Sequence, residues 1–288
     1  MTNIEQSTPK FEYEWQNPNQ NKFDFGRVFT RTFNILKLRG VKMMVLSTML
    51  LGIPFMLMSI WPMFLSGGLG DIVISNDPDA LSEIFTGGLI AVLVFGGLLV
   101  LLATLWLQPA LIKISYTALT EEDLPTTSVL KQMTRFVMPV LGFYIIYIFA
   151  VLFGIILLVI PALFIALGWM LAGHIIVLEG QGVMDSISRS WTLTKGSKRW
   201  LLLLAVVIGV IGSIVGAIVA IPIYLMGSPE VAIIEGASLG YWIVNGVLST
   251  ISQVITTVLG VAWATAAYVE LRKIREGVDP ESKVSVFN

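Results

Sequence analysis

The 288-residue chain is 56% hydrophobic and only 13% charged, with a mean hydropathy of +0.83 and a formal net charge of −1. Soluble globular domains are typically about 45–50% apolar and about 25% charged, so the composition excludes that class and predicts an integral membrane protein. The absence of cysteine excludes disulfide bonds and thiolate metal sites.

Five stretches without a charged residue are each longer than the roughly 20 residues that an α-helix needs to cross about 30 Å of hydrocarbon. The third stretch, residues 136–178, is long enough for two crossings, and Pro161 marks the expected turn between them. The six predicted spans are 42–65, 86–114, 138–159, 162–179, 199–225 and 240–270. Because these segments are apolar on all sides, they favour transmembrane helices over the alternating strands of a β-barrel.

The charge distribution predicts the orientation in the membrane. All 18 Lys and Arg residues fall on one side of the six predicted spans, and the only charged residues in the connections on the other side are acidic. By the positive-inside rule, both termini are cytoplasmic in a multi-pass protein of a bacterial-type inner membrane. The first 21 residues lack the basic and apolar regions of a signal peptide, so we expect a disordered cytoplasmic tail over 1–23 and a second cytoplasmic tail over 276–288.

A short amphipathic stretch precedes each odd-numbered span. In the first stretch, helical periodicity places an apolar face on Phe25, Val28, Phe29, Thr32, Phe33 and Leu36. The opposite, polar face of this stretch consists of Arg27, Arg31 and Asn34. In the third stretch, Asp185 precedes Arg189 by one helical turn, and this spacing predicts an ion pair within the helix.

The first and third stretches also match residue by residue. Residues 31–37, RTFNILK, and residues 189–195, RSWTLTK, share an arginine, a hydroxyl, an aromatic residue, three spacers and a lysine. The even-numbered spans end alike, in SYTALTEE, IIVLEGQG and AYVELRKI. We therefore predict an all-α membrane domain over 24–275, built from three pseudo-repeats of an interfacial amphipathic helix and a helical hairpin. The repeats are expected over about 24–122, 126–182 and 183–275.

Few polar residues lie within the predicted spans. Asn245, Ser249, Gln253 and Thr256 fall near one stripe of span 6, which either lines a polar path or joins helices by hydrogen bonds. No ionisable residue joins the stripe, which favours the second interpretation. His174 is the only histidine, so we expect a packing residue, with no metal and no cofactor. The motifs of hydrolases and phosphate-binding enzymes are also lacking, which predicts that the chain is not an enzyme.

Two segments suggest a family. LEGQGVMDSISRSWTLTKGSKRW, residues 178–200, resembles a region of the membrane domain of glycerophosphoryl diester phosphodiesterases through Glu179, Arg189, Trp191, Lys195 and Trp200. The ending YVELRKIREGVD, residues 268–279, is similar to the terminus of that domain. The resemblance implies a stand-alone membrane domain without the catalytic domain that is fused to it in some relatives.

The leading hypothesis is a non-catalytic membrane protein that organises lipid, anionic lipid in particular, or a membrane partner at the cytoplasmic face. The partner is a second protein or another copy of the chain, and no nucleic acid is expected. The predicted contacts are basic and aromatic residues of the third stretch and their counterparts in the first: Arg189, Trp191, Lys195, Lys198, Arg199, Trp200, Arg27, Arg31 and Lys37. The alternative is a transporter or export component that uses the polar stripe of span 6.

Overall fold

The computed structural model describes residues 23–60, 88–120, 122, 125–157, 159–227, 232 and 237–277. Within these residues, all regular secondary structure is helical. Six helices are long and apolar enough to cross a membrane, as expected for an integral membrane protein. They cover Phe25–Ser59, Val94–Leu119, Thr126–Leu157, Ile160–Glu179, Lys198–Met226 and Leu239–Glu276. The expected tail over 1–23 lies outside the described residues except for Phe23, and so does most of the tail expected over 276–288.

The first half of the chain forms α1 (Phe25–Ser47), a π-helical turn η1 (Thr48–Gly52), α2 (Ile53–Ile60), α6 (Gly88–Leu119), α7 (Thr126–Met133) and a 3-10 turn η2 (Thr134–Phe136). The second half forms α8 (Val137–Leu157), α9 (Val159–Trp169), α10 (Ala172–Glu179), α11 (Val183–Thr194), α12 (Lys198–Met226) and α14 (Leu239–Glu276).

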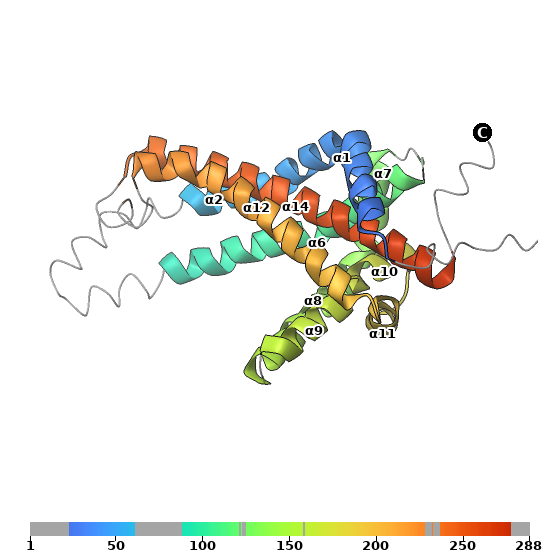
Figure 1. The fold of residues 1–288 in the computed structure, drawn as a ribbon. Helices are drawn as coiled ribbons and strands as arrows, with labels where there is room; N and C mark the ends of the chain where they lie inside the picture. The colour runs from blue at the N-terminus through green and yellow to red at the C-terminus, as the bar shows by residue number, and fades with distance from the viewer. Residues whose placement is uncertain are drawn as a thin grey trace, which may run out of the picture.

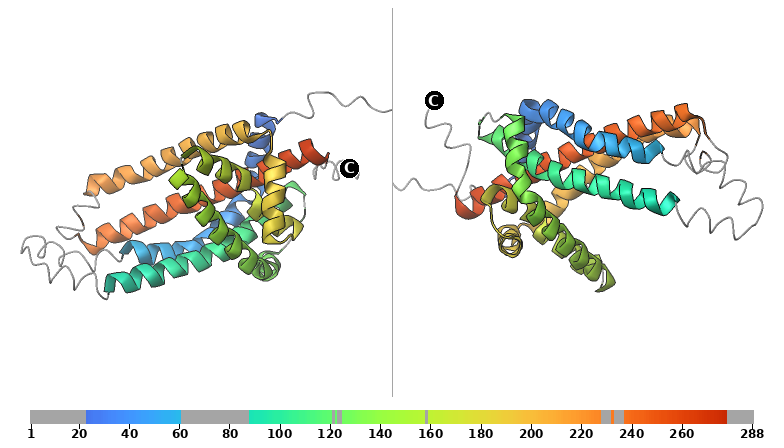
Figure 2. Two further views of the ribbon diagram at one scale, coloured as in Figure 1. Left: turned by 90° about the horizontal axis from the view of Figure 1, so that it is seen from below. Right: turned by 180° about the vertical axis from the view of Figure 1, so that it is seen from behind.

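Helix α14 is the element around which the others are arranged. It packs against α1, α2, α6 and α12, and these helices run side by side in the left view of Figure 2. The α8–α9 hairpin leaves this group and projects to one side (Figure 1). The main core is apolar and lies where α1, α6, α10 and α14 meet, and its largest buried side chains include Ile35, Leu111, Ile175 and Tyr268. Helices α7, α10 and α11 gather at one end of the bundle, which we call the polar end.

The predicted spans match the helices through their apolar centres but not at the polar end. Residues 25–36 were expected to form a helix separate from span 1, yet α1 runs without interruption from Phe25 to Ser47. Helix α14 likewise continues past the predicted end of its span to Glu276. No proline intervenes in either place, so the helix can continue where the apolar sequence stops. After Glu270 the polar residues Arg272, Lys273 and Arg275 also have good helix propensity.

The turn in the third apolar stretch lies earlier than predicted. Helix α8 ends at Leu157 and α9 begins at Val159, so Pro161 falls in the first turn of α9 instead of forming the turn. This position suits proline, because the backbone amide that it lacks has no partner in the first turn of a helix. The two helices approach closely at Gly154, where an added Cβ atom would lie 2.8 Å from the Cα of Ala162.

The fourth span is interrupted between α9 and α10, and a serine from α11 bonds to the backbone at the interruption. The Ser190 hydroxyl donates to the carbonyl oxygen of Gly168 at 2.7 Å and accepts from the backbone amide of Leu171 at 3.3 Å. Ser190 is fully buried, as is Leu171. The side chain therefore replaces hydrogen bonds that the broken helix cannot make for itself.

We expect Ser190→Ala to lower the stability of the protein by about 1–3 kcal/mol, because it leaves a buried amide and a buried carbonyl without this partner. The measurement is thermal unfolding of the purified protein in mild detergent. Ser188→Ala is the matched control, since Ser188 lies on the exposed face of the same helix. Equal losses in the two variants would contradict the role assigned to Ser190.

Candidate functional site

The last turns of α14 carry polar side chains on two opposite faces. Successive residues of an α-helix are about 100° apart, so Tyr268, Arg272 and Glu276 share one face and Glu270 lies on the other. The first face meets α10 and α11, and the second meets the start of α1. Two separate polar clusters result at the polar end of the bundle.

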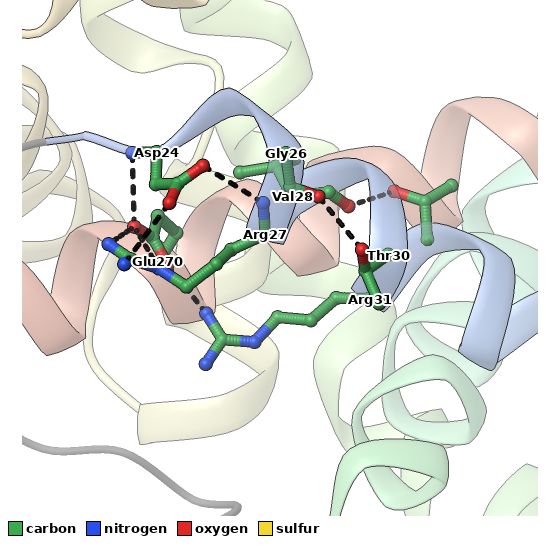
Figure 3. A network of polar contacts seen from close by, with 8 residues as sticks. Asp24, Gly26, Arg27, Val28, Thr30, Arg31 and Glu270 are labelled. Atoms are coloured by element: carbon green, nitrogen blue, oxygen red, sulfur yellow. Dashed lines mark hydrogen bonds and ion pairs between the residues drawn. The ribbon is translucent and has the colours of Figure 1, made fainter.

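The first cluster, which we call the Glu270 cluster, joins α14 to α1 (Figure 3). The Glu270 carboxylate has no exposed surface and accepts from Nη2 of Arg27 at 2.6 Å and from Nη1 of Arg31 at 2.7 Å. It also accepts from Nε of Arg27 and from the backbone amide of Asp24 at 3.2 Å. Asp24 in turn begins α1, because its side chain accepts from the backbone amide of Arg27 at 3.2 Å.

Burial makes these ion pairs important for the fold. The side chain of Arg31 is only 4% exposed and that of Glu270 is not exposed at all, so the guanidinium and the carboxylate have both lost most of their contact with water. Removing one partner of a buried ion pair leaves an uncompensated charge and typically costs about 3–5 kcal/mol. Arg31 of the predicted polar face of this stretch is thus buried against α14, while Phe33 of the predicted apolar face is 64% exposed.

The second cluster, the Glu179 cluster, joins α10, α11 and α14. Arg189 of α11 forms ion pairs with Oε2 of Glu179 and, at 2.8 Å, with Oε1 of Glu276. The Tyr268 hydroxyl donates to Glu179 at 2.8 Å, and Nε of Arg272 donates to Glu276 at 3.0 Å. The ion pair predicted between Asp185 and Arg189 is replaced by these two contacts, because the acids of α10 and α14 reach the guanidinium from other elements.

The surroundings of Arg189 keep it charged. Burial lowers the pKa of its guanidinium, but the hydrogen bonds and negative charges of Glu179 and Glu276 outweigh that effect and raise the pKa overall. A group that is already charged at neutral pH gains no proton over the physiological range. The cluster is thus held by a permanent positive charge between two carboxylates.

His174 lies beside the second cluster as a packing residue. Its side chain is buried, and its ring stacks on that of Tyr268 with centroids 6.3 Å apart. No group of three or more His, Asp or Glu side chains suited to a metal ion occurs in the described part of the chain.

The predicted lipid or partner contacts divide into two sets. Arg27, Arg31 and Arg189 belong to the two clusters, where their guanidinium groups bind carboxylates. The remaining predicted contacts lie at the surface or are only half-buried: Lys37, Trp191, Lys195, Lys198, Arg199 and Trp200.

The surface near the start of α12 combines lysines, an arginine and two tryptophans. The Lys198 ammonium lies 3.3 Å from the ring centroid of Trp191 and 5.2 Å from that of Phe164. The guanidinium of Arg199 lies 5.6 Å from the ring centroid of Trp200. We call Trp191, Lys195, Lys198, Arg199 and Trp200 the basic–aromatic surface. Trp191 is fixed in place by Gly168, whose missing side chain leaves room for the indole ring.

The polar stripe of span 6 lies on α14, where three of its four members take part in hydrogen bonds along the helix. Ser249 donates to the side chain of Asn245 at 3.4 Å, and Gln253 donates to the hydroxyl of Thr257 at 3.5 Å. Gln253 and Thr256 are exposed on the single chain, and Thr256 lies near Gly212 of α12.

An open cavity of about 400 Å³ adjoins the Glu270 cluster. It lies between the start of α1 and the end of α14, and its lining consists of Asp24, Gly26, Arg27, Thr30, Arg31, Asn34 and Lys273. We call it the α1–α14 cavity.

Sequence reasoning missed the roles of the acidic partners. Glu270 falls at the end of predicted span 6 with no role, Asp24 is not singled out, and Glu179 and Glu276 enter through the resemblance without a basic partner assigned to them. The one signal that could have found Glu270 is the recurrence of a glutamate in the similar endings IIVLEGQG and AYVELRKI. A glutamate at the end of an apolar span predicts a positively charged partner. The arginine that recurs in the matched stretches is the candidate for that partner.

The fold and the clusters define an all-helical integral membrane protein whose helices are joined by ion pairs at one end. The sequence matches the family described as a domain of unknown function, DUF7847, over residues 78–271. Because this match covers more than half of the chain, the chain belongs to that family. No curated protein and no solved structure gives a significant match.

We expect Glu270→Gln to lower the free energy of unfolding by about 3–5 kcal/mol, because two arginines lose their shared carboxylate. The measurement is the thermal unfolding midpoint in detergent, with helix content followed by circular dichroism. Glu122→Gln is the control: its side chain is 55% exposed and lies 3.9 Å from Lys113, so a change of at most about 1 kcal/mol is expected. A Glu270→Gln variant as stable as this control would contradict the structural role of the cluster.

Proposed function

We propose that the chain is a non-catalytic membrane protein that gathers anionic lipid at the cytoplasmic face of a bacterial-type inner membrane. The observation that carries the proposal is the basic–aromatic surface at the start of α12. Its two tryptophans are 41% and 38% exposed, beside three basic residues. Tryptophan is enriched where hydrocarbon meets headgroups, and each Lys or Arg near an anionic surface contributes about 1 kcal/mol to binding.

The contacts within this surface support lipid binding over a purely structural role. Lys198 rests on an aromatic ring and not against a carboxylate, so its positive charge is not neutralised there. Lys195 and Arg199 are exposed, and Gly196, between Lys195 and Lys198, takes a positive φ of 79° that turns the chain from α11 into α12. The basic residues therefore follow one another closely at the junction of α11 and α12, which suits contact with phosphate headgroups.

The orientation in this proposal has both termini in the cytoplasm. The one-sided distribution of Lys and Arg supports it. Helices α7 and α11 are short and have polar residues on one side, which suits helices that lie in the headgroup region.

We further infer that the membrane domain is built from three pseudo-repeats. The first and third units support this through equivalent environments. Arg31 and Arg189 each bind a glutamate at the end of a return span, and the residues that follow them, Thr32 and Ser190, are both buried. Phe33 and Trp191 come next, and both are exposed.

The proposal includes a distant relationship to the membrane domain of glycerophosphoryl diester phosphodiesterases. Two residues of the resembling segments, Glu179 and Arg189, form an ion pair, and a third, Glu276, also binds Arg189. A shared need to join these helices accounts for similar residues at these positions.

The alternative function is transport along the polar stripe of α14. The exposure of Gln253 and Thr256 is the observation that favours it. The hydrogen bonds of Ser249 and Gln253 to neighbours on the same helix support the structural interpretation instead, because they satisfy polar groups without water.

The transport alternative is tested by cysteine labelling, since the chain has no cysteine of its own. Single cysteines at positions 249, 253 and 256 are treated with membrane-impermeant thiol reagents in intact membranes. Our proposal predicts protection at all three positions, because the stripe faces hydrocarbon or another helix. Ready modification at all three would favour a water-filled path.

For lipid binding, we expect a variant with Lys195, Lys198 and Arg199 all changed to Gln to lose about a hundredfold in its preference for phosphatidylglycerol over phosphatidylcholine. The loss of three charges at about 1 kcal/mol each corresponds to this factor, since about 1.4 kcal/mol is tenfold. Native mass spectrometry of the lipids that remain bound in mild detergent measures the preference. The comparison variant changes Lys131 and Arg135, two exposed basic residues outside the surface, and it is expected to lose less of the preference because it removes fewer charges and leaves both tryptophans with their basic neighbours. Retention of the wild-type preference by the triple variant would refute the proposal.

A further inference from the structure

We propose that the junction of α11 and α12, together with one arginine from the end of α14, binds the phosphate group of a single anionic lipid. The inference rests on the proposed function and makes it more specific, because it names the bound group and adds a residue from outside the basic–aromatic surface. We call the residues that would bind the phosphate the junction site: Lys195, Ser197, Lys198, Arg199 and Arg275.

Arg275 reaches the junction from a helix that is distant in sequence. The end of α14 lies beside α11 (Figure 1). A Cβ atom added at Gly196 would lie 3.1 Å from Nη2 of Arg275, so the guanidinium packs against the glycine of the turn. Gly196 also has a positive φ of 79°, which suits a residue without a side chain. The glycine therefore allows α14 to bring a positive charge close to the start of α12.

The positive charges of the junction site are not neutralised by carboxylates. In the described part of the chain, no ion pair involves its four basic residues, Lys195, Lys198, Arg199 and Arg275. Glu276, which follows Arg275 in sequence, binds Arg189 and Arg272 instead. The Lys198 ammonium donates to the carbonyl oxygen of Phe164 at 3.5 Å, a contact that leaves its charge in place. An anion from outside the chain can balance this excess of positive charge.

The start of α12 supplies uncharged hydrogen-bond donors at the same place. The backbone amides of Trp200 and Leu201 donate to the carbonyl oxygen of Ser197 at 3.0 Å. Those of Lys198 and Arg199 have no backbone partner among the described residues, as is usual for the first residues of a helix. Ser197, at the N-cap position, is only 7% exposed, yet its hydroxyl makes no capping bond. Two amides and a hydroxyl thus remain at the positive end of a 29-residue helix, where a phosphate is favoured.

The two tryptophans favour a lipid as the source of the phosphate. Trp191 and Trp200 flank the junction in sequence and are 41% and 38% exposed. Because tryptophan is enriched where hydrocarbon meets headgroups, these rings indicate that the junction site lies at the level of lipid phosphates. Its positive charges repel the ammonium group of choline, so an anionic headgroup is preferred over phosphatidylcholine. A phosphate bound there would join α14 to the α11–α12 junction.

The experiment places the full chain in nanodiscs of phosphatidylcholine with an increasing fraction of phosphatidylglycerol. The unfolding midpoint is measured, and hydrogen exchange is followed over residues 195–201. A lipid that binds the folded chain raises the midpoint. Because the phosphate would accept hydrogen bonds from the first amides of α12, we expect phosphatidylglycerol also to slow the exchange of those amides. Diffuse attraction to an anionic surface would raise the midpoint without this local slowing.

Variants at one position of α14 test whether it belongs to the site. Arg275→Gln is expected to weaken the stabilisation by phosphatidylglycerol about fivefold in apparent affinity, the equivalent of one charge contact, and to reduce the slowing of exchange. Arg275→Lys keeps the charge and is expected to retain most of both effects. Lys131→Gln is the matched control, because it removes one exposed charge on α7, outside the site. We expect it to weaken the stabilisation less and to leave exchange at the start of α12 unchanged.

Two outcomes would overturn the inference while the proposed function stands. The first is that Arg275→Gln behaves like Lys131→Gln, although the triple variant of Lys195, Lys198 and Arg199 loses the preference for phosphatidylglycerol. The second is that phosphatidylglycerol stabilises the wild-type chain without slowing exchange at the start of α12. A third outcome, in which the wild-type chain shows no preference for phosphatidylglycerol at all, would overturn the proposed function and the inference together.

Discussion

The fold depends on a carboxylate that is removed from water and surrounded by donors from another helix. Glu270 has no exposed surface, and its oxygen atoms accept from Arg27, Arg31 and the backbone of Asp24. In an apolar bundle, most side-chain contacts are interchangeable, because one apolar surface packs on another with little directional preference. A buried charge has no such freedom, since it is stable only where its partner lies. The position of the start of α1 on α14 is fixed by this requirement.

Helix α14 uses its two polar faces to join parts of the chain that are far apart in sequence. Glu270 binds residues more than 230 positions earlier, and Tyr268 and Glu276 bind residues of α10 and α11. These contacts occur within about two turns of one helix, so a rotation of α14 would disturb both clusters together. The polar end of the bundle is therefore coupled through a single element, while the other end is held by apolar packing between neighbouring helices. A small apolar group of buried residues that includes Ile223, Tyr241 and Trp242 is an example of such packing.

The sequence was sufficient to predict the membrane spans, because the length of an apolar segment is a local property. It was insufficient to predict the ion pairs of the polar end, because the partners there lie far apart in the chain. The sequence places Arg31 on the polar face of its own helix, and only the presence of Glu270 on another helix explains why it is buried. Arg189 was assigned to Asp185 by local spacing, but Glu179 and Glu276 reach it from two other elements. The exposed residues of the basic–aromatic surface were identified from the sequence, since exposed positions depend least on distant partners.

The bond between Ser190 and the broken backbone of the fourth span has a consequence for biosynthesis. A helix that enters the membrane without its full set of backbone hydrogen bonds carries a free-energy cost in hydrocarbon. The group that removes this cost lies 19 residues after Leu171, beyond the end of the span itself. The fourth span therefore completes its backbone hydrogen bonds only when α11 has packed against it. Insertion of this span and docking of the helix that follows it are in this way coupled steps.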